Sequence, residues 1–281
     1  LLGRRLADSV SNAEAARAIG DIAAGKTACT WKSTKARGRV VVTGGDQTAR
    51  RTRTTAAAMF AWGIKHGLVR ANPFRDIPLS AAPMRERFLS PGETASLLRA
   101  LDEAGASGAV SGNCCDAIRL LLLTGARKTE ILALRWQEVE LPRARLSLPP
   151  ERTKTGGKTG RRYIALSGFA IEILSRLASN KRSSTFVFPA NSSAGHLIAL
   201  RRPFLRVCEL ADLKDLTIHD LRHTFASMAV ANGHSLFAVG KALGHASTRT
   251  TERYAHLTND PLVALANSVH ESILTADETS S

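Results

Sequence analysis

Apolar residues recur at helical spacing over most of the chain, and short segments rich in Gly, Pro or charge separate these stretches. The Ala-rich residues 12–24 predict a first helix that ends at Gly25. Residues 46–66 predict a second helix, with Asp46 as its N-cap and Gly67 as its stop. Five residues of this second stretch repeat at the spacing of one helix face and are expected to face a core: Ala56, Met59, Phe60, Gly63 and Ile64.

A linker separates this helical unit from a larger domain. Pro73 and Pro78 interrupt the helical pattern, and residues 81–88 have the composition of a linker. Ser90 and Glu93 then flank Pro91 as N-cap and N3 of a new helix, the arrangement of a capping box. We therefore expect a helical domain over residues 1–80, a linker over 81–88, a larger domain over 89–258, and a C-terminal helix with a polar tail over 259–281.

The larger domain contains one predicted β element, over residues 145–166. Leu146 and Leu148 alternate with polar neighbours, a Gly-rich turn follows at 155–158, and Tyr163 and Ile164 lead out of it. Because the remaining apolar stretches have helical spacing, the predicted fold class is mainly α with a small β hairpin or sheet (α+β).

The net charge of the chain indicates what kind of partner it binds. Thirty-nine Lys and Arg against twenty-four Asp and Glu give a formal charge of +15, which attracts polyanions, and nucleic acid is the commonest of these. A ribosome-associated protein or a merely basic surface is the alternative at this point.

The cellular context follows from what the sequence lacks. The sequence contains no apolar run near the ~20 residues of a membrane span and no secretory signal at its start. The four cysteines show no C-x-x-C spacing, and the adjacent Cys114 and Cys115 precede an apolar run, so we expect them to be small core residues. These features favour a reduced cytoplasm.

A basic segment lies inside the first unit. Residues 26–53 hold eight Lys or Arg and a single acid, Asp46. Arg50, Arg51 and Arg53 fall in the first turns of the second helix, where cations oppose the helix dipole. Phosphates would supply the missing counter-charge, although a solvated basic face is the plainer interpretation.

Four short segments of the larger domain carry candidate chemistry. Arg127 follows Gly125 just before an amphipathic stretch, and Lys154 lies at the tip of the predicted hairpin. His219 and Arg222 lie three apart on a predicted helix and so share one face, which indicates anion binding.

The fourth segment ends at a tyrosine. Gly244 is a natural helix-terminating residue that leaves His245 in a turn, and Tyr254, one of only two tyrosines, follows on a predicted helix. Taken singly, these residues could be surface charges and a core tyrosine with a polar handle.

Together these residues point to phosphoryl transfer. That chemistry asks a protein mainly for positioning and for cations around the non-bridging oxygens, and arginine forks match phosphate geometry. The sequence has no Asp/Glu cluster with metal-binding spacing and no Gly-rich nucleotide loop, so we expect a scheme without metal or cofactor and with a side-chain nucleophile. A phenol of pKa ~10 needs a base or local positive charge to serve as that nucleophile.

At these residues the chain closely resembles the tyrosine recombinase family, the phage-integrase group, over roughly residues 47–258. The resemblance rests on five motifs in order: T-G-x-R…E at residues 124–130, the hairpin Lys154, H-x-x-R at 219–222, L-G-H at 243–245, and Tyr254 nine positions later. Ala126 stands where a larger aliphatic is common, and Lys128-Thr129 is an unusual filling before Glu130. Neither departure removes a catalytic group, so an active enzyme is expected.

The resemblance implies a role for each matched residue. Tyr254 would attack the scissile phosphate and form a 3′-phosphotyrosyl link, and His219 would take its proton. Lys154 would protonate the departing 5′-oxygen. Three residues would hold the non-bridging oxygens: Arg127, Arg222 and His245. Glu130 would orient these side chains, or be an ordinary helix acid.

The resemblance also implies an architecture and partners. The family fold is a two-domain C-shaped clamp around duplex DNA, made of a helical core-binding domain and a catalytic domain. The expected phosphate contacts of the core-binding half are Lys35, Arg37, Arg50, Arg51 and Arg53. The expected partners are double-stranded DNA with specific attachment sites, a homo-tetramer on DNA and an accessory directionality factor, with no membrane. The implied role is integration or excision of a mobile element in a bacterial or phage-derived, nucleoid-associated setting.

Two further expectations concern the ends of the chain. Because it begins at Leu1, we expect that an N-terminal arm-binding domain has been removed. Near the other end, a helical apolar stripe would either pack on its own domain or exchange between neighbouring copies: Leu262, Leu265, Ala266, Val269 and Ile273.

Two alternative functions stay open from sequence alone. A type IB topoisomerase would use related chemistry as a relaxing monomer, and a plasmid relaxation assay set against recombination between two cognate sites would separate the two. A non-catalytic DNA-binding protein on the same fold would leave every activity unchanged in Tyr254→Phe.

Overall fold

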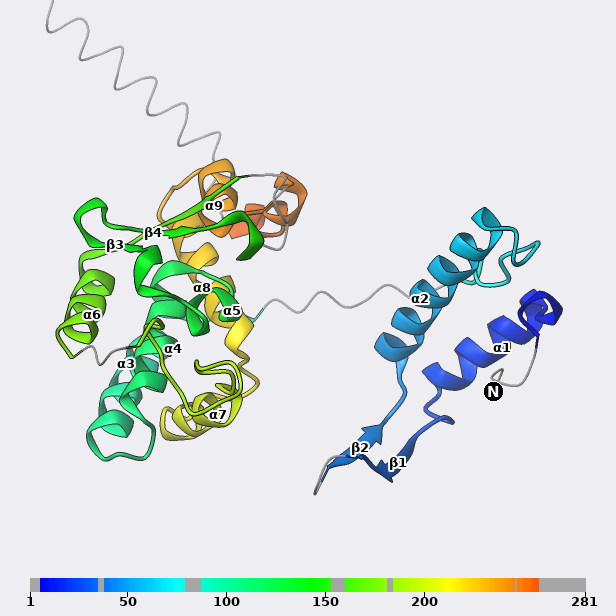
Figure 1. Cartoon of the computed structure of the whole chain (residues 1–281), viewed down its shortest axis with the longest axis horizontal. Helices are drawn as coiled ribbons and strands as arrows, with labels where there is room; N and C mark the ends of the chain where they lie inside the picture. The colour runs from blue at the N-terminus through cyan, green and yellow to red at the C-terminus, as the bar shows by residue number, and fades with distance from the viewer. Residues whose placement is uncertain are drawn as a thin grey trace, which may run out of the picture. The chain divides into compact units, whose positions relative to one another are not determined.

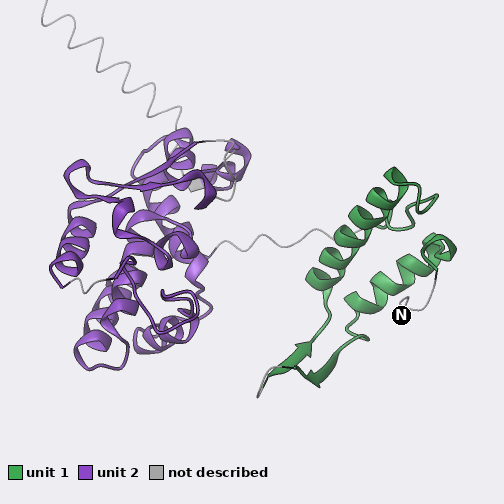
Figure 2. Ribbon diagram, in the orientation of Figure 1, with its two compact units in different colours: residues 1–85 green, residues 86–281 purple. Residues whose placement is uncertain are grey.

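The computed structural model describes residues 6–34, 38–78, 87–152, 160–180, 184–245 and 247–257, and its contacts divide the chain into two units, residues 1–85 and 86–281 (Figure 2). Within the described residues, no helix is both long and apolar enough to cross a lipid bilayer.

Unit 1 is a pair of helices with a small ribbon between them (Figure 1). Its elements in chain order are η1 (Ala7–Ser9), α1 (Asn12–Ala23), β1 (Cys29–Lys32), β2 (Arg39–Val42) and α2 (Asp46–Lys65). The core between the helices is small, as expected for a unit of this size: Ala15, Ile19, Ala49, Phe74 and Ile77.

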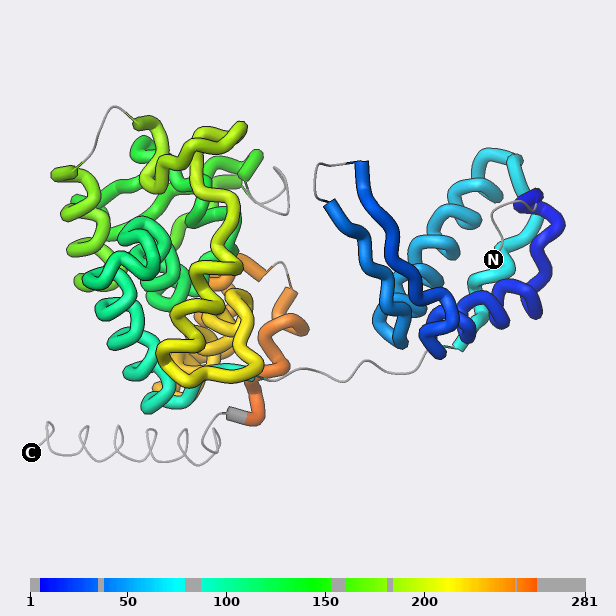
Figure 3. The backbone as a smooth tube through the Cα atoms, turned by 90° about the horizontal axis from the view of Figure 1, so that it is seen from below, coloured from blue at the N-terminus to red at the C-terminus, as the bar shows by residue number. Residues whose placement is uncertain are grey.

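Part of the basic segment of residues 26–53 forms a two-stranded ribbon that the sequence pattern did not indicate. Strands β1 and β2 pair antiparallel, with Trp31 opposite Val40 and Lys32 opposite Arg39. The run from Val40 to Val42 has the β-branched residues that favour strands, which outweighs the polar loop composition around it. In two perpendicular views the ribbon extends away from α1 and α2 (Figures 1 and 3).

Two predictions about α2 are wrong. The helix is capped by Gly45 and has Asp46 as its first residue. Met59 is 67% exposed and Ile64 43% exposed, so these two do not face a core. A single partner helix covers only one side of α2, and Phe60, which packs on Phe74 with 5.4 Å between ring centroids, lies on that side.

Unit 2 is mostly helical. Its α-helices are α3 (Pro91–Ala106), α4 (Gly112–Thr124), α5 (Lys128–Leu132), α6 (Gly168–Ser179), α7 (Arg201–Leu210), α8 (Ile218–Ala231) and α9 (Leu236–Leu243). The 3-10 turns are η2 (Trp136–Glu138), η3 (Leu141–Arg143), η4 (Pro150–Arg152), η5 (Thr248–Thr250) and η6 (Glu252–Leu257). The predicted capping box at the start of α3 is confirmed: the Ser90 hydroxyl accepts the Glu93 N–H at 3.2 Å, and Glu93 accepts the Ser90 N–H at 2.9 Å.

The predicted β element is confirmed and gains a third strand. Strands β3 (Val139–Glu140), β4 (Arg145–Leu148) and β5 (Arg162–Ala165) pair antiparallel in the order β3-β4-β5, with Leu146 opposite Ile164. Both leucines of β4 are buried in the main core of unit 2, but Ser147 between them is also buried, so the strand does not alternate between core and solvent as its sequence predicts. Arg162 at the start of β5 is buried as well.

Helix α8 positions the candidate site. It contacts α4, α9 and η6, and it begins at a capping pair in which the Asp220 carboxylate accepts the Thr217 N–H at 2.7 Å. Cys114 and Cys115 lie buried in α4 as predicted, within a helix that is nearly enclosed by its neighbours.

Candidate active site

A glycine turn brings Arg127 into the site. Gly125 ends α4 in the left-handed conformation (φ 59°), and a β-carbon there would lie 2.6 Å from the Phe225 ring and 2.9 Å from Leu243. Only glycine fits such a position without displacing α8 and α9. The turn directs Arg127 to the start of α5, where the Glu130 carboxylate accepts its backbone N–H at 2.7 Å and its guanidinium at 3.0 Å.

Three arginines meet at the C-terminal end of α9. Arg162, Arg222 and Arg127 donate to three successive carbonyls, those of Ala242 at 3.2 Å, Leu243 at 2.6 Å and Gly244 at 3.2 Å. The last carbonyls of a helix lack partners within the helix and carry its negative dipole end, so they attract cations. The helix end thus fixes the guanidinium groups in place.

Gly244 permits this arrangement. It ends α9 with φ 67°, and a β-carbon on it would lie 2.7 Å from the Arg162 Nε atom. The predicted helix stop is therefore confirmed, and the residue also leaves space for a guanidinium that is only 9% exposed.

The cluster keeps an excess of positive charge. Arg222 is buried and donates to the Gly125 carbonyl at 2.7 Å as well as to Leu243. Among the described residues, Glu130 is the one carboxylate bonded to these arginines, at 3.0 Å from Arg127 and 2.5 Å from Arg162. Burial, and next the Arg127 charge, lower the pKa of Arg222 to about 10, so it stays charged at neutral pH. Three cations against one carboxylate make a site suited to an anion.

His245 lies in the turn after α9, next to this cluster. Its Nδ1 atom is 2.9 Å from the hydroxyl of Thr251, whose side chain is fully buried. Burial first, and the charges of Arg222 and Arg127 next, lower the pKa of His245 to about 4, so the imidazole is neutral at pH 7. A neutral ring whose Nδ1 is anchored leaves the other nitrogen for a ligand.

Tyr254 lies on the 3-10 turn η6, where the sequence predicted a helix. The two short 3-10 turns η5 and η6 pack against α9 and α8 in place of a regular helix. Tyr254 packs with Ala226, Val230 and Leu243 and is 5% exposed. Burial raises the pKa of Tyr254, while the nearby Arg253 and Arg222 charges act to lower it.

The hydroxyl of Tyr254 contacts a histidine that the sequence did not single out. That group is His223, through its Nδ1 atom. The predicted partner, His219, lies one turn earlier on α8, is exposed, and packs edge-on against His223 with 4.8 Å between ring centroids. The i, i+4 spacing of the two histidines was the available signal, because it places both on one helix face.

Six further residues were predicted for catalysis or for contact with DNA. Lys154, Lys35 and Arg37 lie outside the described residues. Arg50, Arg51 and Arg53 are on α2 in unit 1; Arg51 is exposed, and the Arg53 guanidinium donates to the Arg75 carbonyl. The cluster described above is thus made of residues of unit 2, of which the sequence did not indicate Arg162 and His223.

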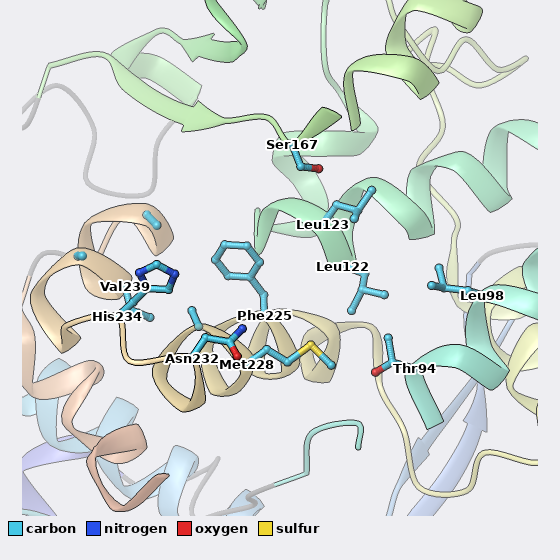
Figure 4. Close-up of a pocket in the computed structure, with 13 residues that line it drawn as sticks. Thr94, Leu98, Leu122, Leu123, Ser167, Phe225, Met228, Asn232, His234 and Val239 are labelled. Carbon is cyan, nitrogen blue, oxygen red and sulfur yellow. The ribbon is translucent and has the colours of Figure 1, made fainter. Parts of the chain in front are cut away.

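An apolar hollow of about 510 Å³ adjoins the site on another side of α8 (Figure 4). Phe225 and Met228 of α8 line it together with Leu122 and Leu123 of α4 and Leu98 of α3. Helix α8 therefore supplies Arg222 and His223 to the candidate site and lines the apolar hollow with Phe225 and Met228.

Comparison with known proteins defines the class of this chain. The sequence pattern of the phage integrase family matches residues 87–260, so the chain belongs to that family. Among its relatives are the prophage integrase IntF of Escherichia coli K12, 31% identical over 162 residues, and the tyrosine recombinase XerC of Xanthomonas campestris, 27% identical over 218 residues. These alignments cover 56% and 75% of this chain but only 33% and 64% of the two relatives.

Solved structures share the fold. The Tn1549 transposon integrase in complex with a circular intermediate DNA has a TM-score of 0.67 and 21% identity, with 94% of this chain and 86% of that one covered. The XerH recombinase bound to a palindromic difH substrate has a TM-score of 0.67 and 19% identity, with 92% and 72% covered. The mostly helical unit 2 with its small sheet therefore has the tyrosine recombinase catalytic fold.

Proposed function

We propose that this chain is a site-specific DNA recombinase that cuts and rejoins duplex DNA through a 3′-phosphotyrosyl intermediate, for integration or excision of a mobile element. The observation that carries the proposal is the cluster of three arginines with one carboxylate beside a buried tyrosine. Such a cluster binds a phosphodiester and stabilises the charge that develops on its oxygens, which is the largest demand of phosphoryl transfer.

Each group has a role in the proposal. Tyr254 attacks the phosphorus, while Arg127, Arg222 and His245 hold the non-bridging oxygens. Glu130 orients Arg127 through the bond described above, and Lys154 gives a proton to the departing 5′-oxygen. Because the products are a phosphotyrosine and a free hydroxyl, the step runs backward as readily as forward, and the strand is rejoined without hydrolysis.

Unit 1 is proposed as the core-binding half of a clamp on DNA. Its exposed ribbon carries Lys32 opposite Arg39, and Arg51 is exposed on α2. Exposed Lys and Arg attract phosphates without reading sequence, and a two-stranded ribbon fits a major groove. Lys35, Arg37, Arg50 and Arg53 are proposed as further phosphate contacts.

Assembly is the second part of the proposal. Four copies would act together on two DNA duplexes in the nucleoid of a bacterial cytoplasm, with a directionality factor choosing between integration and excision. The apolar stripe of residues 262–273 supplies a candidate linker between copies, and the hollow between α3, α4, α8 and α9 has the apolar lining that would receive it.

The experiment that tests the proposed chemistry uses a duplex nicked beside the scissile position, so that cleavage traps the protein on DNA. Wild-type protein is expected to form a covalent adduct and Tyr254→Phe to form none, because the phenol is the nucleophile. The chain has only one other tyrosine, the 49% exposed Tyr163 on β5, so Tyr163→Phe is the matched control and is expected to keep the adduct. An adduct that survives in Tyr254→Phe would contradict the proposal.

A further inference from the structure

The hydroxyl of Tyr254 has one hydrogen-bonding partner among the described side chains, the Nδ1 atom of His223. The two rings lie 5.9 Å apart between centroids and are tilted at 49°, and the phenol contacts the imidazole through its hydroxyl oxygen and the Nδ1 atom. His219, in contrast, reaches only the His223 ring, edge-on. The two histidines lie one helical turn apart, and of the two it is His223 that contacts the tyrosine.

We infer that His223 takes the phenolic proton of Tyr254 as the tyrosine attacks the scissile phosphate, an inference that rests on the function proposed above. The Tyr254 oxygen forms the new bond to phosphorus and the bond from phosphorus to the 5′-oxygen breaks. The phenolic proton moves to His223 Nδ1, and the 5′-oxygen takes its proton from a separate donor, proposed above as Lys154. In the rejoining step the proton returns from His223 to the phenol.

The charges around His223 leave it able to accept a proton. From its own helix it faces His219, Asp220 and Arg222, and from η6 it faces Arg253 and Tyr254. Burial, and next the charges of Arg253 and His219, lower its pKa to about 4, whereas Asp220 acts to raise it. Above that pH the ring is neutral, and in the tautomer that has its proton on Nε2 the Nδ1 atom has a lone pair to receive the phenolic proton.

Bound DNA strengthens His223 as a base. A phosphodiester among the arginines adds a negative charge and offsets the cations that disfavour an imidazolium. His223 therefore becomes more basic when the substrate is in place, and proton transfer is coupled to the attack. His219 is exposed and packs against His223, so its role is to position the His223 imidazole or the phosphate.

The test is the pH dependence of single-turnover adduct formation on the nicked duplex, at fixed salt, between pH 6 and pH 9. With His223 as the acceptor, the wild-type rate should level off as the pH rises, because a neutral imidazole takes the proton and the tyrosine need not ionise first. In His223→Gln the tyrosine must ionise before it attacks, so the rate should be lower and rise about tenfold per pH unit toward the raised pKa of Tyr254. A merely structural loss would lower the rate equally at every pH.

His219→Gln is the matched comparison, because it removes the neighbouring histidine on the same helix face. It is expected to lower the rate and keep the wild-type profile. The inference is overturned if His219→Gln acquires the steep profile or if His223→Gln keeps the wild-type profile. It is also overturned if the adduct rate of the wild-type protein rises tenfold per pH unit. That result does not depend on whether any variant folds.

A second variant distinguishes a role of His223 as the base from a purely structural role. His223→Ala opens a small space, and imidazole added to the buffer is expected to restore part of its adduct rate while leaving His219→Ala unimproved. Rescue of His219→Ala alone would count against the inference. The proposed function fails differently: the wild type would then give no adduct, or Tyr254→Phe would keep one.

Discussion

The arginine cluster of unit 2 is held differently from the exposed Arg51 of unit 1. In unit 2, Arg127, Arg162 and Arg222 are at least half-buried and bonded to the last carbonyls of α9, so their positions are set before any ligand arrives. In unit 1, Arg51 stands exposed on α2. A buried, oriented guanidinium serves one phosphate group at a defined place, whereas an exposed one contributes to long-range attraction that salt screens. The same residue type thus suits chemistry in one unit and affinity in the other.

The largest effect is expected from Arg222→Lys. A lysine carries the charge but not the two divergent N–H bonds to Gly125 and Leu243, so the phosphate loses an oriented donor. Adduct formation should fall about 10²- to 10³-fold, the usual cost of one such donor. Single-turnover kinetics on the nicked duplex measure this effect.

The matched control for that variant is Arg206→Lys on α7. Its guanidinium is half-exposed and paired only with Glu209, at 3.1 Å. It should react at the wild-type rate. Equal losses in both variants would show that oriented bonds to α9 are irrelevant and would remove the contrast between the two kinds of arginine.

A smaller effect is expected from Gly244→Ala. The positive φ of 67° strains any other residue, and the added β-carbon would meet Arg162 at 2.7 Å. The strain should lower the free energy of unfolding by about 1–2 kcal/mol, and the displaced guanidinium should slow adduct formation as well.

Thermal unfolding and adduct kinetics together check this variant. Gly233→Ala is the control for backbone strain, because Gly233 also has a positive φ (84°) but an added β-carbon there would meet open space. Gly233→Ala should lower the free energy of unfolding, but the folded protein should form the adduct at close to the wild-type rate. If both variants slow the reaction equally, the space kept for Arg162 has no role.

The smallest effect is expected from Arg51→Ala. Removing one exposed phosphate contact should weaken DNA binding modestly and reduce the slope of log affinity against log salt by about 1. Fluorescence anisotropy over a salt series measures both. Arg17→Ala, an exposed arginine on α1, is the comparison and should change the slope less. If Arg51→Ala slowed adduct formation as severely as Arg222→Lys, Arg51 would have a role in the chemistry and not only in affinity, and the contrast would fail.

Features that depend on local sequence were predicted well. Arg127 and His245 each follow a glycine that ends a helix, Gly125 and Gly244, so the turns that carry them could be expected from the sequence. The capping box at Ser90 was predicted for the same reason.

What failed depends on distant partners. Arg162 is an ordinary-looking strand residue, and only the pairing of β5 with β4 and the approach of α9 bury it beside Glu130. The exposure of Met59 reflects how few elements cover α2, which periodicity alone cannot reveal. The ribbon of unit 1 was missed because its basic composition masked the strand-forming valines.

The most direct test of the central claim is to locate the covalent bond itself. Wild-type protein is trapped on the nicked duplex, the DNA is trimmed by nuclease, and the modified peptide is identified by mass spectrometry. We predict a single nucleotide-bearing peptide in which Tyr254 is linked through its oxygen to a 3′-phosphate. A nucleotide on Tyr163, on a serine or on no residue at all would contradict the account.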